Sequence, residues 1–210
     1  MKEDILKYIN KITKKATMPK RILEHFILMG TSTVSDIAKN IDVSLPTAAA
    51  ALNDLMVHGL VKEVGKKETS TGRIPMLYDL NPKAGYFIGA NPEMSHLALT
   101  ATDFCGHPIV DKTSVPYHYE NTVDNLEQMG QILNQFIDSL PVKREDILNV
   151  CVNIAERVNA HEGKTYTIFS FNDEPLTDRI SKMIDLPVCI ENDTRSMTYA
   201  EFIKGSCRGL

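Results

Sequence analysis

The chain has 210 residues, of which 43% are hydrophobic and 24% charged, a composition typical of a soluble globular protein with room for two small domains. No apolar run is long enough to span a membrane and the N-terminus lacks a signal-peptide core, so we expect a cytoplasmic protein with no membrane partner. The four cysteines form no CxxC pair, which excludes a zinc ribbon and a disulfide framework. We therefore expect reduced, mostly buried thiols, no metal site and no cofactor.

The formal net charge of −4 is unevenly distributed along the chain. Residues 1–85 carry 13 Lys and Arg against 9 Asp and Glu, whereas residues 86–210 carry 10 against 18, so the two parts are +4 and −8. A basic first part and an acidic second part suit a regulator whose first part meets phosphate. Chance clustering of solvated charge is the alternative.

Residues 1–17 are rich in lysine and place Ile5, Leu6, Ile9 and Ile12 at helical spacing. This pattern predicts an amphipathic helix that packs on its own domain, with packing on a dimer mate or on DNA phosphates as alternatives. A second helix is predicted over residues 18–29. Its buried stripe is expected to comprise Ile22, Leu23, Phe26 and Ile27, with His25 at the surface.

The segment from Val34 to Leu60 has the periodicity of two short helices joined by a tight corner at residues 42–44. Ser44 can cap the second helix, Pro46 suits its first turn, and Gly59 suits its end. Two helices about such a corner are typical of a helix-turn-helix, whose second helix enters the major groove of DNA. The alternative is a helical hairpin inside a larger core.

The residues after this hairpin favour the first interpretation. Residues 60–64 are predicted to be a strand, residues 65–73 a polar loop with basic side chains, and residues 74–80 a returning strand. A helix, a helix-turn-helix and a basic β-hairpin in that order predict a winged helix-turn-helix domain over residues 18–82.

The predicted DNA contacts come from the second helix and the hairpin. The apolar residues Leu45, Ala48, Leu52, Leu55 and Met56 should face inward, leaving Ser44, Pro46, Thr47, Ala50, Ala51 and Asn53 for double-stranded DNA. Few of these side chains read base edges, so methyl contacts to thymine should contribute much of the sequence readout. Affinity is expected from Lys66, Lys67 and Arg73 through phosphate or minor-groove contacts, with a solvated loop tip as the alternative.

A boundary is predicted at residues 81–85, where Pro82 and Gly85 break the strand. Beyond it, three strands over residues 86–90, 96–102 and 107–116 predict an antiparallel meander. Alternating helices and strands follow: helix 123–139, strand 147–155, helix 174–184, strand 187–191 and helix 192–204. This order predicts an α/β domain over residues 85–210 with helices on both faces of its sheet, and a last helix whose apolar face includes Met197, Tyr199, Ala200 and Ile203.

The segment VCIENDTRSMTYAEFIKG at residues 188–205 resembles the ROK family of sugar kinases and sugar-responsive repressors. The loop signature of that family is matched by Glu191-Asn192-Asp193, with Ala200, Glu201 and Gly205 in step. The run Thr71-Gly72-Arg73 with Pro75 is similar to the wing of the family's repressors. The resemblance implies a ribonuclease-H-like, actin-like lobe behind the winged helix, a sugar effector, and a homodimer or higher oligomer. It also implies that the chain ends where a second lobe would begin.

In the family's kinases the matching asparagine and aspartate bind the sugar and accept its proton, which implies sugar-binding roles for Asn192 and Asp193. Helix capping by Asp193 is the alternative. Two departures oppose nucleotide binding. Asn91-Pro92-Glu93-Met94-Ser95 stands where the family has an Asp-x-Gly-Gly-Thr phosphate loop, and Glu156 replaces a glycine in a second turn.

We therefore predict a DNA-binding regulator, a repressor of carbohydrate genes with a sugar-sensing domain and no catalytic residues. A sugar kinase fused to a DNA-binding domain and a dimerisation module that needs no ligand are the alternatives.

Overall fold

A computed structural model describes residues 2–13, 17–67 and 74–206. The chain folds into two compact units, which we call the first unit (residues 1–84) and the second unit (residues 85–210). No helix in the described part of the chain is both long and apolar enough to cross a lipid bilayer.

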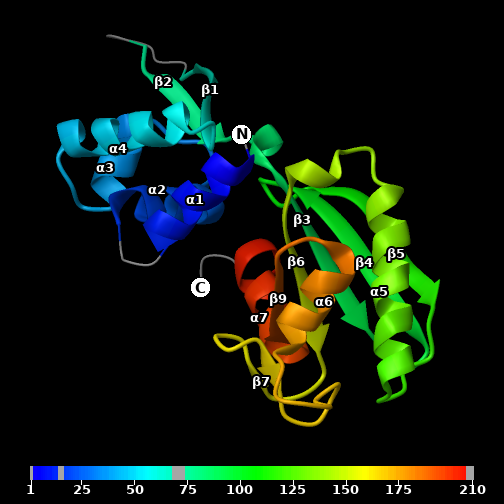
Figure 1. Ribbon diagram of the computed structural model, residues 1–210. Coiled ribbons are helices and arrows are strands. Elements are labelled where there is room, and N and C mark those ends of the chain that lie inside the picture. The colour runs from blue at the N-terminus through cyan, green and yellow to red at the C-terminus, as the bar shows by residue number, and fades with distance from the viewer. Residues whose placement is uncertain (1, 14–16, 68–73, 207–210) are drawn as a thin grey trace. The chain divides into compact units, whose positions relative to one another are not determined.

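The described residues of the first unit form four α-helices and a β-hairpin (Figure 1). The helices are α1 (Lys2–Thr13), α2 (Met18–Met29), α3 (Val34–Asn40) and α4 (Leu45–Val57). Strands β1 (Val61–Lys66) and β2 (Met76–Leu80) pair antiparallel, and Ser32 forms an isolated bridge with Tyr78. The core of this unit contains Ile22, Phe26, Ile37, Ala48, Leu52, Leu55 and Leu60, each at most 3% exposed.

The corner between α3 and α4 has the local chemistry that the sequence predicts. Asp42 adopts the left-handed region at φ 52°, which Asp tolerates better than most residues. The Ser44 hydroxyl accepts the backbone N–H of Thr47 and caps α4, and Pro46 lies in the first turn, where a backbone donor is not needed. After α4, Gly59 takes φ 71° and turns the chain into β1.

Several predictions for the first unit are wrong in detail. His25 is buried and Ile27 is 39% exposed, because the inward face of α2 is turned toward Ser32, which supplies a polar partner for the imidazole. Leu45 is 52% exposed, since it is the first residue of α4 and lies at the corner. Lys66 belongs to β1 and not to the loop, because β1 continues through an irregularity between Glu63 and Gly65.

The second unit is built on a five-stranded mixed sheet of order β5-β4-β3-β6-β9. Strands β3 (Tyr86–Pro92), β4 (His96–Asp103) and β5 (Pro108–Pro116) form the predicted antiparallel meander. Strands β6 (Ile147–Ile154) and β9 (Val188–Asn192) extend it in parallel from β3. Two short strands, β7 (Val158–Asn159) and β8 (Lys164–Thr165), form a separate hairpin.

Helices α5 (Val123–Asp138) and α6 (Leu176–Ile184) pack on one face of this sheet. The core lies between these helices and the sheet. Gly130 brings the two helices close together, since a Cβ there would lie 2.9 Å from Met183 Sδ. The core includes Ile88, Leu97, Leu99, Leu126, Leu133, Phe136, Val150, Val152, Ile180 and Ile190.

The prediction that helices cover both faces of the sheet is right only in part, because the second face is left largely uncovered. Strand β6 alternates, with Val150 and Val152 buried while Cys151 and Asn153 are half-buried on the opposite face, and Cys189 beside them on β9 is exposed. Of the helices that the structure describes in the second unit, α7 (Asp193–Lys204) is the one that runs along this second face, where Ser196 donates a hydrogen bond to Asn153 Oδ1. Periodicity alone does not reveal whether another element covers a face.

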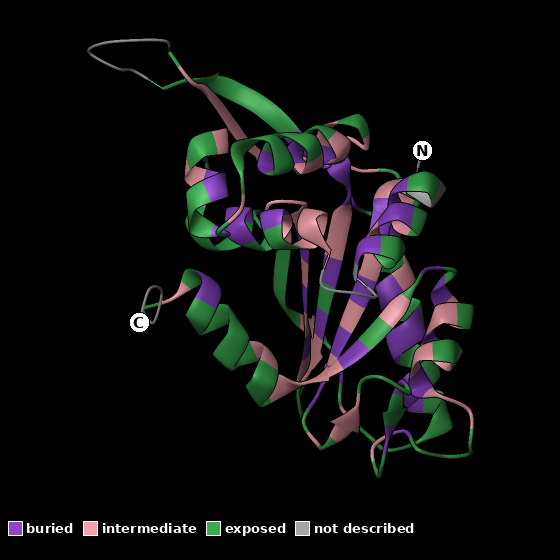
Figure 2. Cartoon of the chain, turned by 90° about the vertical axis from the view of Figure 1, so that its left-hand side faces the viewer, coloured by how far each residue is buried: buried purple, intermediate pink, exposed green. Residues whose placement is uncertain are grey.

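Helix α7 exposes most of the residues expected in its apolar face, and green predominates along it in Figure 2. Met197 is 58% and Tyr199 is 63% exposed, Ala200 is exposed, and of these four residues only Ile203 is buried.

The prediction of mostly buried cysteines is also wrong, because Cys105 and Cys151 are half-buried and Cys189 is exposed. Cys207 lies outside the described residues.

Candidate nucleic-acid interface and ligand hollow

The structure presents one side of α4 to solvent, and we call this side the α4 surface. The side chains of Ser44, Pro46, Thr47, Ala50 and Asn53 are exposed, and Ala51 is half-buried. The opposite side of α4 is held in the core by Ala48, Leu52 and Leu55. Small side chains on an anchored helix allow a second surface to approach the helix backbone closely.

Hydrogen bonding at the start of α4 limits what this surface can read. The Ser44 and Thr47 hydroxyl oxygens lie 2.7 Å apart and bond to each other. This bond uses part of the hydrogen-bonding capacity of the Thr47 hydroxyl, while the methyl groups of Thr47, Ala50 and Ala51 offer apolar contacts. This chemistry matches contacts to thymine methyl groups better than bidentate hydrogen bonds to base edges.

The three cations expected to bind phosphate are in different situations. Lys66 is exposed at the end of β1. Lys67 Nζ lies 3.4 Å from Asp36 Oδ2 at the start of α3, and Arg73 lies outside the described residues. An ion pair between two such exposed side chains contributes at most about 1 kcal/mol, so Lys67 can exchange Asp36 for a phosphate at little cost.

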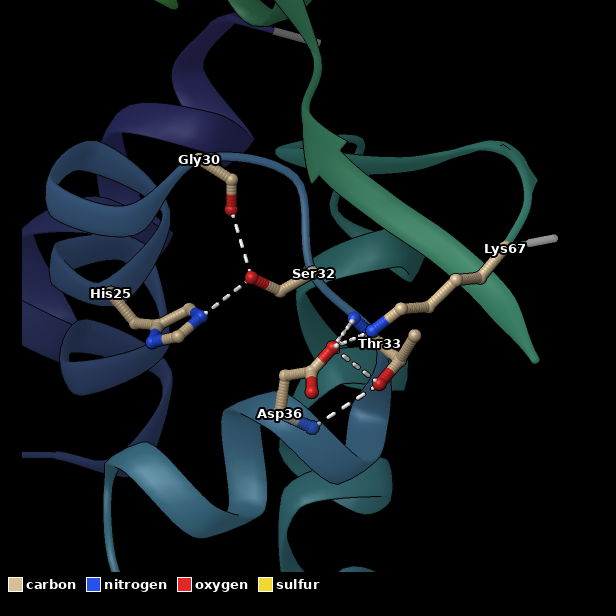
Figure 3. A network of polar contacts seen from close by, with 6 residues as sticks. All are labelled: His25, Gly30, Ser32, Thr33, Asp36 and Lys67. Carbon is tan, nitrogen blue, oxygen red and sulfur yellow. Dashed lines mark hydrogen bonds and ion pairs between the residues drawn. The ribbon is translucent and has the colours of Figure 1, made fainter. Parts of the chain in front are cut away.

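Asp36 is the centre of the polar network in Figure 3. Its carboxylate accepts the hydroxyl of Thr33 at 2.8 Å and the backbone N–H of Thr33 at 3.2 Å, while Thr33 Oγ1 accepts the N–H of Asp36. These reciprocal bonds form a capping box at the start of α3. The hydrogen bonds from Thr33, and after them Lys67, hold the pKa of Asp36 below its ordinary value.

The buried His25 in the same view was not identified from the sequence. Its Nε2 lies 2.9 Å from Ser32 Oγ, and the Ser32 hydroxyl donates to the Gly30 carbonyl at 3.0 Å. Because the single hydroxyl hydrogen points to Gly30, Nε2 must carry a hydrogen and donate it to Ser32. Burial lowers the pKa of His25, so the neutral imidazole joins α2 to the turn before α3.

Helix α1 packs on the first unit, as its amphipathic pattern predicts. Tyr8 is buried, its hydroxyl donates to Asp54 Oδ2, and its ring stacks on His58 with centroids 3.6 Å apart. Burial, followed by the Asp54 carboxylate, raises the pKa of Tyr8 well above its ordinary value. These contacts hold α1 on the C-terminal half of α4.

The second unit has a hollow of about 560 Å³ at one end of its sheet. Its walls come from the loop after β3, the end of β6 and the start of α7. The lining residues are Asn91, Pro92, Glu93, Met94, Ser95, Tyr119, Ile154, Ala155, Ile168, Asp193 and Met197. Two carboxylates line it and none of these described residues is basic, so its chemistry suits a neutral polar ligand better than a polyphosphate.

Of the predicted sugar-binding pair, Asp193 lines this hollow, whereas Asn192 is not among the lining residues. Asn192 caps α7: its side-chain oxygen accepts the N–H of Arg195, and its Nδ2 donates to the Glu156 carbonyl at 3.0 Å and to Asp193. Asp193 lines the hollow, and its Oδ1 accepts the N–H of Thr194 at 2.7 Å. Capping therefore belongs to Asn192 and not to Asp193.

The segment 91–95, which lines the hollow together with Asp193, is held in place by the carboxylate of Glu93. Glu93 accepts a hydrogen bond from Asn91 Nδ2 at 3.2 Å, and its other oxygen lies 3.3 Å from His96 Nε2. The backbone of Glu93 also bonds to the His96 carbonyl. A phosphate entering this loop would meet a carboxylate where a phosphate loop offers backbone N–H groups.

Glu156 has an organising role that the sequence did not indicate. Its carboxylate accepts the backbone N–H groups of Tyr166, Thr167 and Ile168 and the hydroxyl of Thr167. Several charge-assisted bonds to one carboxylate fix the segment that supplies Ile168 to the hollow. The Glu156 side chain thus anchors a neighbouring loop.

Comparison with known proteins finds a family profile, curated relatives and solved structures to which this chain is similar. The sequence profile described as the ROK family matches residues 98–209. The xylose repressor of Bacillus spizizenii is 23% identical over 197 residues, covering 92% of this chain and 50% of that protein. The xylose repressor of Staphylococcus xylosus is 27% identical over 180 residues, covering 83% of this chain and 45% of that protein.

Among solved structures, a ROK family transcriptional regulator described as a homolog of the E. coli MLC protein matches with a TM-score of 0.67. It is 18% identical and covers 89% of this chain and 48% of that chain, so it shows a shared fold. The chain spans about half the length of the relatives that it matches. Because the family profile matches more than half of its residues, and its second unit has a mixed-sheet α/β fold, the chain belongs to the ROK family.

Proposed function

We propose that this chain is the DNA-binding part and first lobe of a transcriptional repressor of carbohydrate genes. In this proposal residues 1–17 form a supporting helix, residues 18–82 a winged helix-turn-helix domain, and residues 85–210 the first lobe of a sugar-kinase-like domain. The lobe senses a sugar and does not phosphorylate it.

The observation that carries the proposal is the extent of the similarity to the xylose repressors. The match to the Bacillus spizizenii protein covers 92% of this chain, while the second unit comprises only 126 of the 210 residues. The match therefore extends well into the first unit. A sugar kinase without a DNA-binding part would not account for that extension.

The α4 surface supports a specific mode of DNA binding. Helix α4 enters the major groove, where the methyl groups of Thr47, Ala50 and Ala51 contact bases. Lys66 and Arg73 from the hairpin, together with Lys67 once it leaves Asp36, neutralise phosphates. In a homodimer, two such helices contact half-sites about one helical turn apart.

The hollow supports sensing without catalysis. Asp193 and Asn91 offer polar groups for sugar hydroxyls, while Met94, Tyr119 and Met197 offer apolar contacts to the sugar ring. By the resemblance to the family's kinases, Glu93 belongs to the segment that corresponds to their phosphate loop, where a carboxylate opposes phosphate binding. The names of the relatives make xylose the first sugar to test.

Selection of bound sequences from randomised duplex DNA tests the DNA-binding part of the proposal. The wild-type chain should enrich one sequence class, and Ala50→Glu should abolish the enrichment. The matched control Ala200→Glu places the same charge on an exposed position of α7 and should enrich the same sequences. Failure of the wild type to enrich any sequence, or equal enrichment by Ala50→Glu, contradicts the proposal.

Titration calorimetry tests the sensing part. Xylose and related neutral sugars should bind to the wild type more tightly than to Asp193→Ala, whereas MgATP should not bind measurably. Appreciable MgATP affinity would contradict the assignment of Glu93 as a group that excludes phosphate.

A further inference from the structure

We propose that the turn between β4 and β5 binds one zinc ion through Asp103, Cys105 and His107. These residues lie outside both the α4 surface and the hollow. The site combines one oxygen, one sulfur and one nitrogen donor from a single segment of five residues.

The distances between the donor atoms suit a metal ion. The ligand atoms of all three side chains lie within 4.8 Å of one another. Asp103 Oδ2 and His107 Nδ1 are 3.3 Å apart. In a tetrahedral zinc site with Zn–O and Zn–N bonds of about 2.0 Å, the two donor atoms lie about 3.3 Å apart, so this pair already has the required spacing.

The turn is held in the conformation that brings the three side chains together. Asp103 Oδ1 accepts the backbone N–H groups of Cys105 at 2.8 Å and His107 at 2.9 Å. Gly106 takes φ 76°, which a glycine adopts without strain, and its N–H bonds to the Asp103 carbonyl. The carboxylate thus fixes the turn with one oxygen and directs the other toward the imidazole. Hydrogen bonds of this kind, made by the ligand side chain to groups other than the metal, hold the ligand in a fixed orientation.

The donor set and its charge favour zinc over the harder divalent ions. Thiolate and imidazole select zinc and similar transition metals, whereas magnesium and calcium require mainly oxygen ligands. One carboxylate and one thiolate balance the charge of a divalent ion. Three protein ligands leave the fourth position of a tetrahedral zinc ion for water or another ligand.

The site is accessible and separate from the hollow. The side chain of His107 is 70% exposed. Lys204, the last residue of α7, donates a hydrogen bond from Nζ to the Cys105 carbonyl oxygen at 3.4 Å. Strand β4 starts at His96, beside the loop that lines the hollow, and ends at Asp103. At a rise of about 3.3 Å per residue, the two sites are roughly 23 Å apart, so zinc binding and sugar binding can be measured independently.

Cobalt(II) titration of the full chain, freed of metal beforehand, tests the site. Cobalt(II) substitutes for zinc and gives a sulfur-to-metal charge-transfer band when a thiolate coordinates it. We expect one equivalent to bind with this band and zinc to displace it. Cys105→Ser should remove the band, and His107→Asn should weaken binding at least tenfold.

The control variants are Cys189→Ser and His96→Asn, which remove an exposed thiol and an imidazole elsewhere in the second unit. Both should retain the band and the wild-type affinity, and circular dichroism should show that all four variants are folded. A band that survives in Cys105→Ser, a band lost in Cys189→Ser, or no binding by the folded wild type would overturn the proposal.

Discussion

The α4 surface and the hollow differ in charge and in how their polar groups are used. The α4 surface consists of small side chains on a helix fixed at its start by Ser44, and it lies in the basic part of the chain. The hollow is lined by Glu93 and Asp193 in the acidic part. We therefore expect a polyanion to approach the α4 surface closely and to be repelled at the hollow. This difference comes from exposed or lining side chains, which could be substituted without changing the fold of either unit.

The largest expected effect comes from adding a charge to the α4 surface. Ala50→Glu places a carboxylate where the proposed complex brings the DNA close, so DNA affinity should fall at least tenfold, or about 1.4 kcal/mol. Fluorescence anisotropy with a labelled duplex measures this change. Ala200→Glu on α7 should leave affinity within twofold, and an equal loss in both variants would indicate a non-specific charge effect.

The next effect concerns the start of α7. Asn192→Ala removes the helix cap and the donor to the Glu156 carbonyl, so the free energy of unfolding of the second unit should fall by about 1–3 kcal/mol. Asn192→Asp keeps an oxygen that can cap the helix and should cost less. Denaturant unfolding measures both. A loss in Asn192→Asp as large as in Asn192→Ala would show that the cap contributes little.

A smaller effect is expected at the start of α3. Asp36→Asn weakens the capping box with Thr33 and breaks the exposed ion pair with Lys67, which together should destabilise the first unit by about 1 kcal/mol. The same substitution frees Lys67, so DNA affinity should be unchanged or slightly higher. Lower DNA affinity in a folded Asp36→Asn protein would contradict the proposed exchange of Lys67 from Asp36 to phosphate.

The smallest effect is a pH dependence due to His25. Burial lowers the pKa of this residue in the folded state, so the unfolded chain takes up a proton first, near its ordinary pKa of about 6.5. Its contribution to stability is complete above that pH and is lost as the pH falls below it. Thermal unfolding of wild type and His25→Gln across this range should show a steeper acid-side decline in the wild type. Parallel curves would exclude the effect.

Elements with strong periodicity were predictable from the sequence. The helices α2 and α5 and strand β4 of the meander follow from apolar spacing, because each of these elements buries one regular face. The cap at Ser44 follows from its position before Pro46. These features depend on residues close to each other in the chain.

Features that depend on distant partners were not predictable. His25 was expected at the surface because a polar residue on a helix is usually solvated, and its partner Ser32 becomes evident only when α2 meets the following turn. From the sequence, Glu156 indicated only the loss of a glycine. Its hydrogen-bond partners lie 10–12 residues further along the chain, so the local pattern did not reveal them. Asp103, Cys105 and His107 do not have the CxxC spacing by which zinc ligands are recognised in a sequence, so the sequence did not indicate them.

The most direct test of the central claim is the salt dependence of DNA affinity. For the wild-type chain, the logarithm of the association constant should fall linearly with the logarithm of salt concentration. Lys66→Ala should reduce that slope by about one unit, and Lys182→Ala, which removes an exposed lysine from α6 in the second unit, should leave it unchanged. A slope that Lys66→Ala does not alter, or that Lys182→Ala alters equally, would contradict the claim that the first unit contacts the DNA backbone.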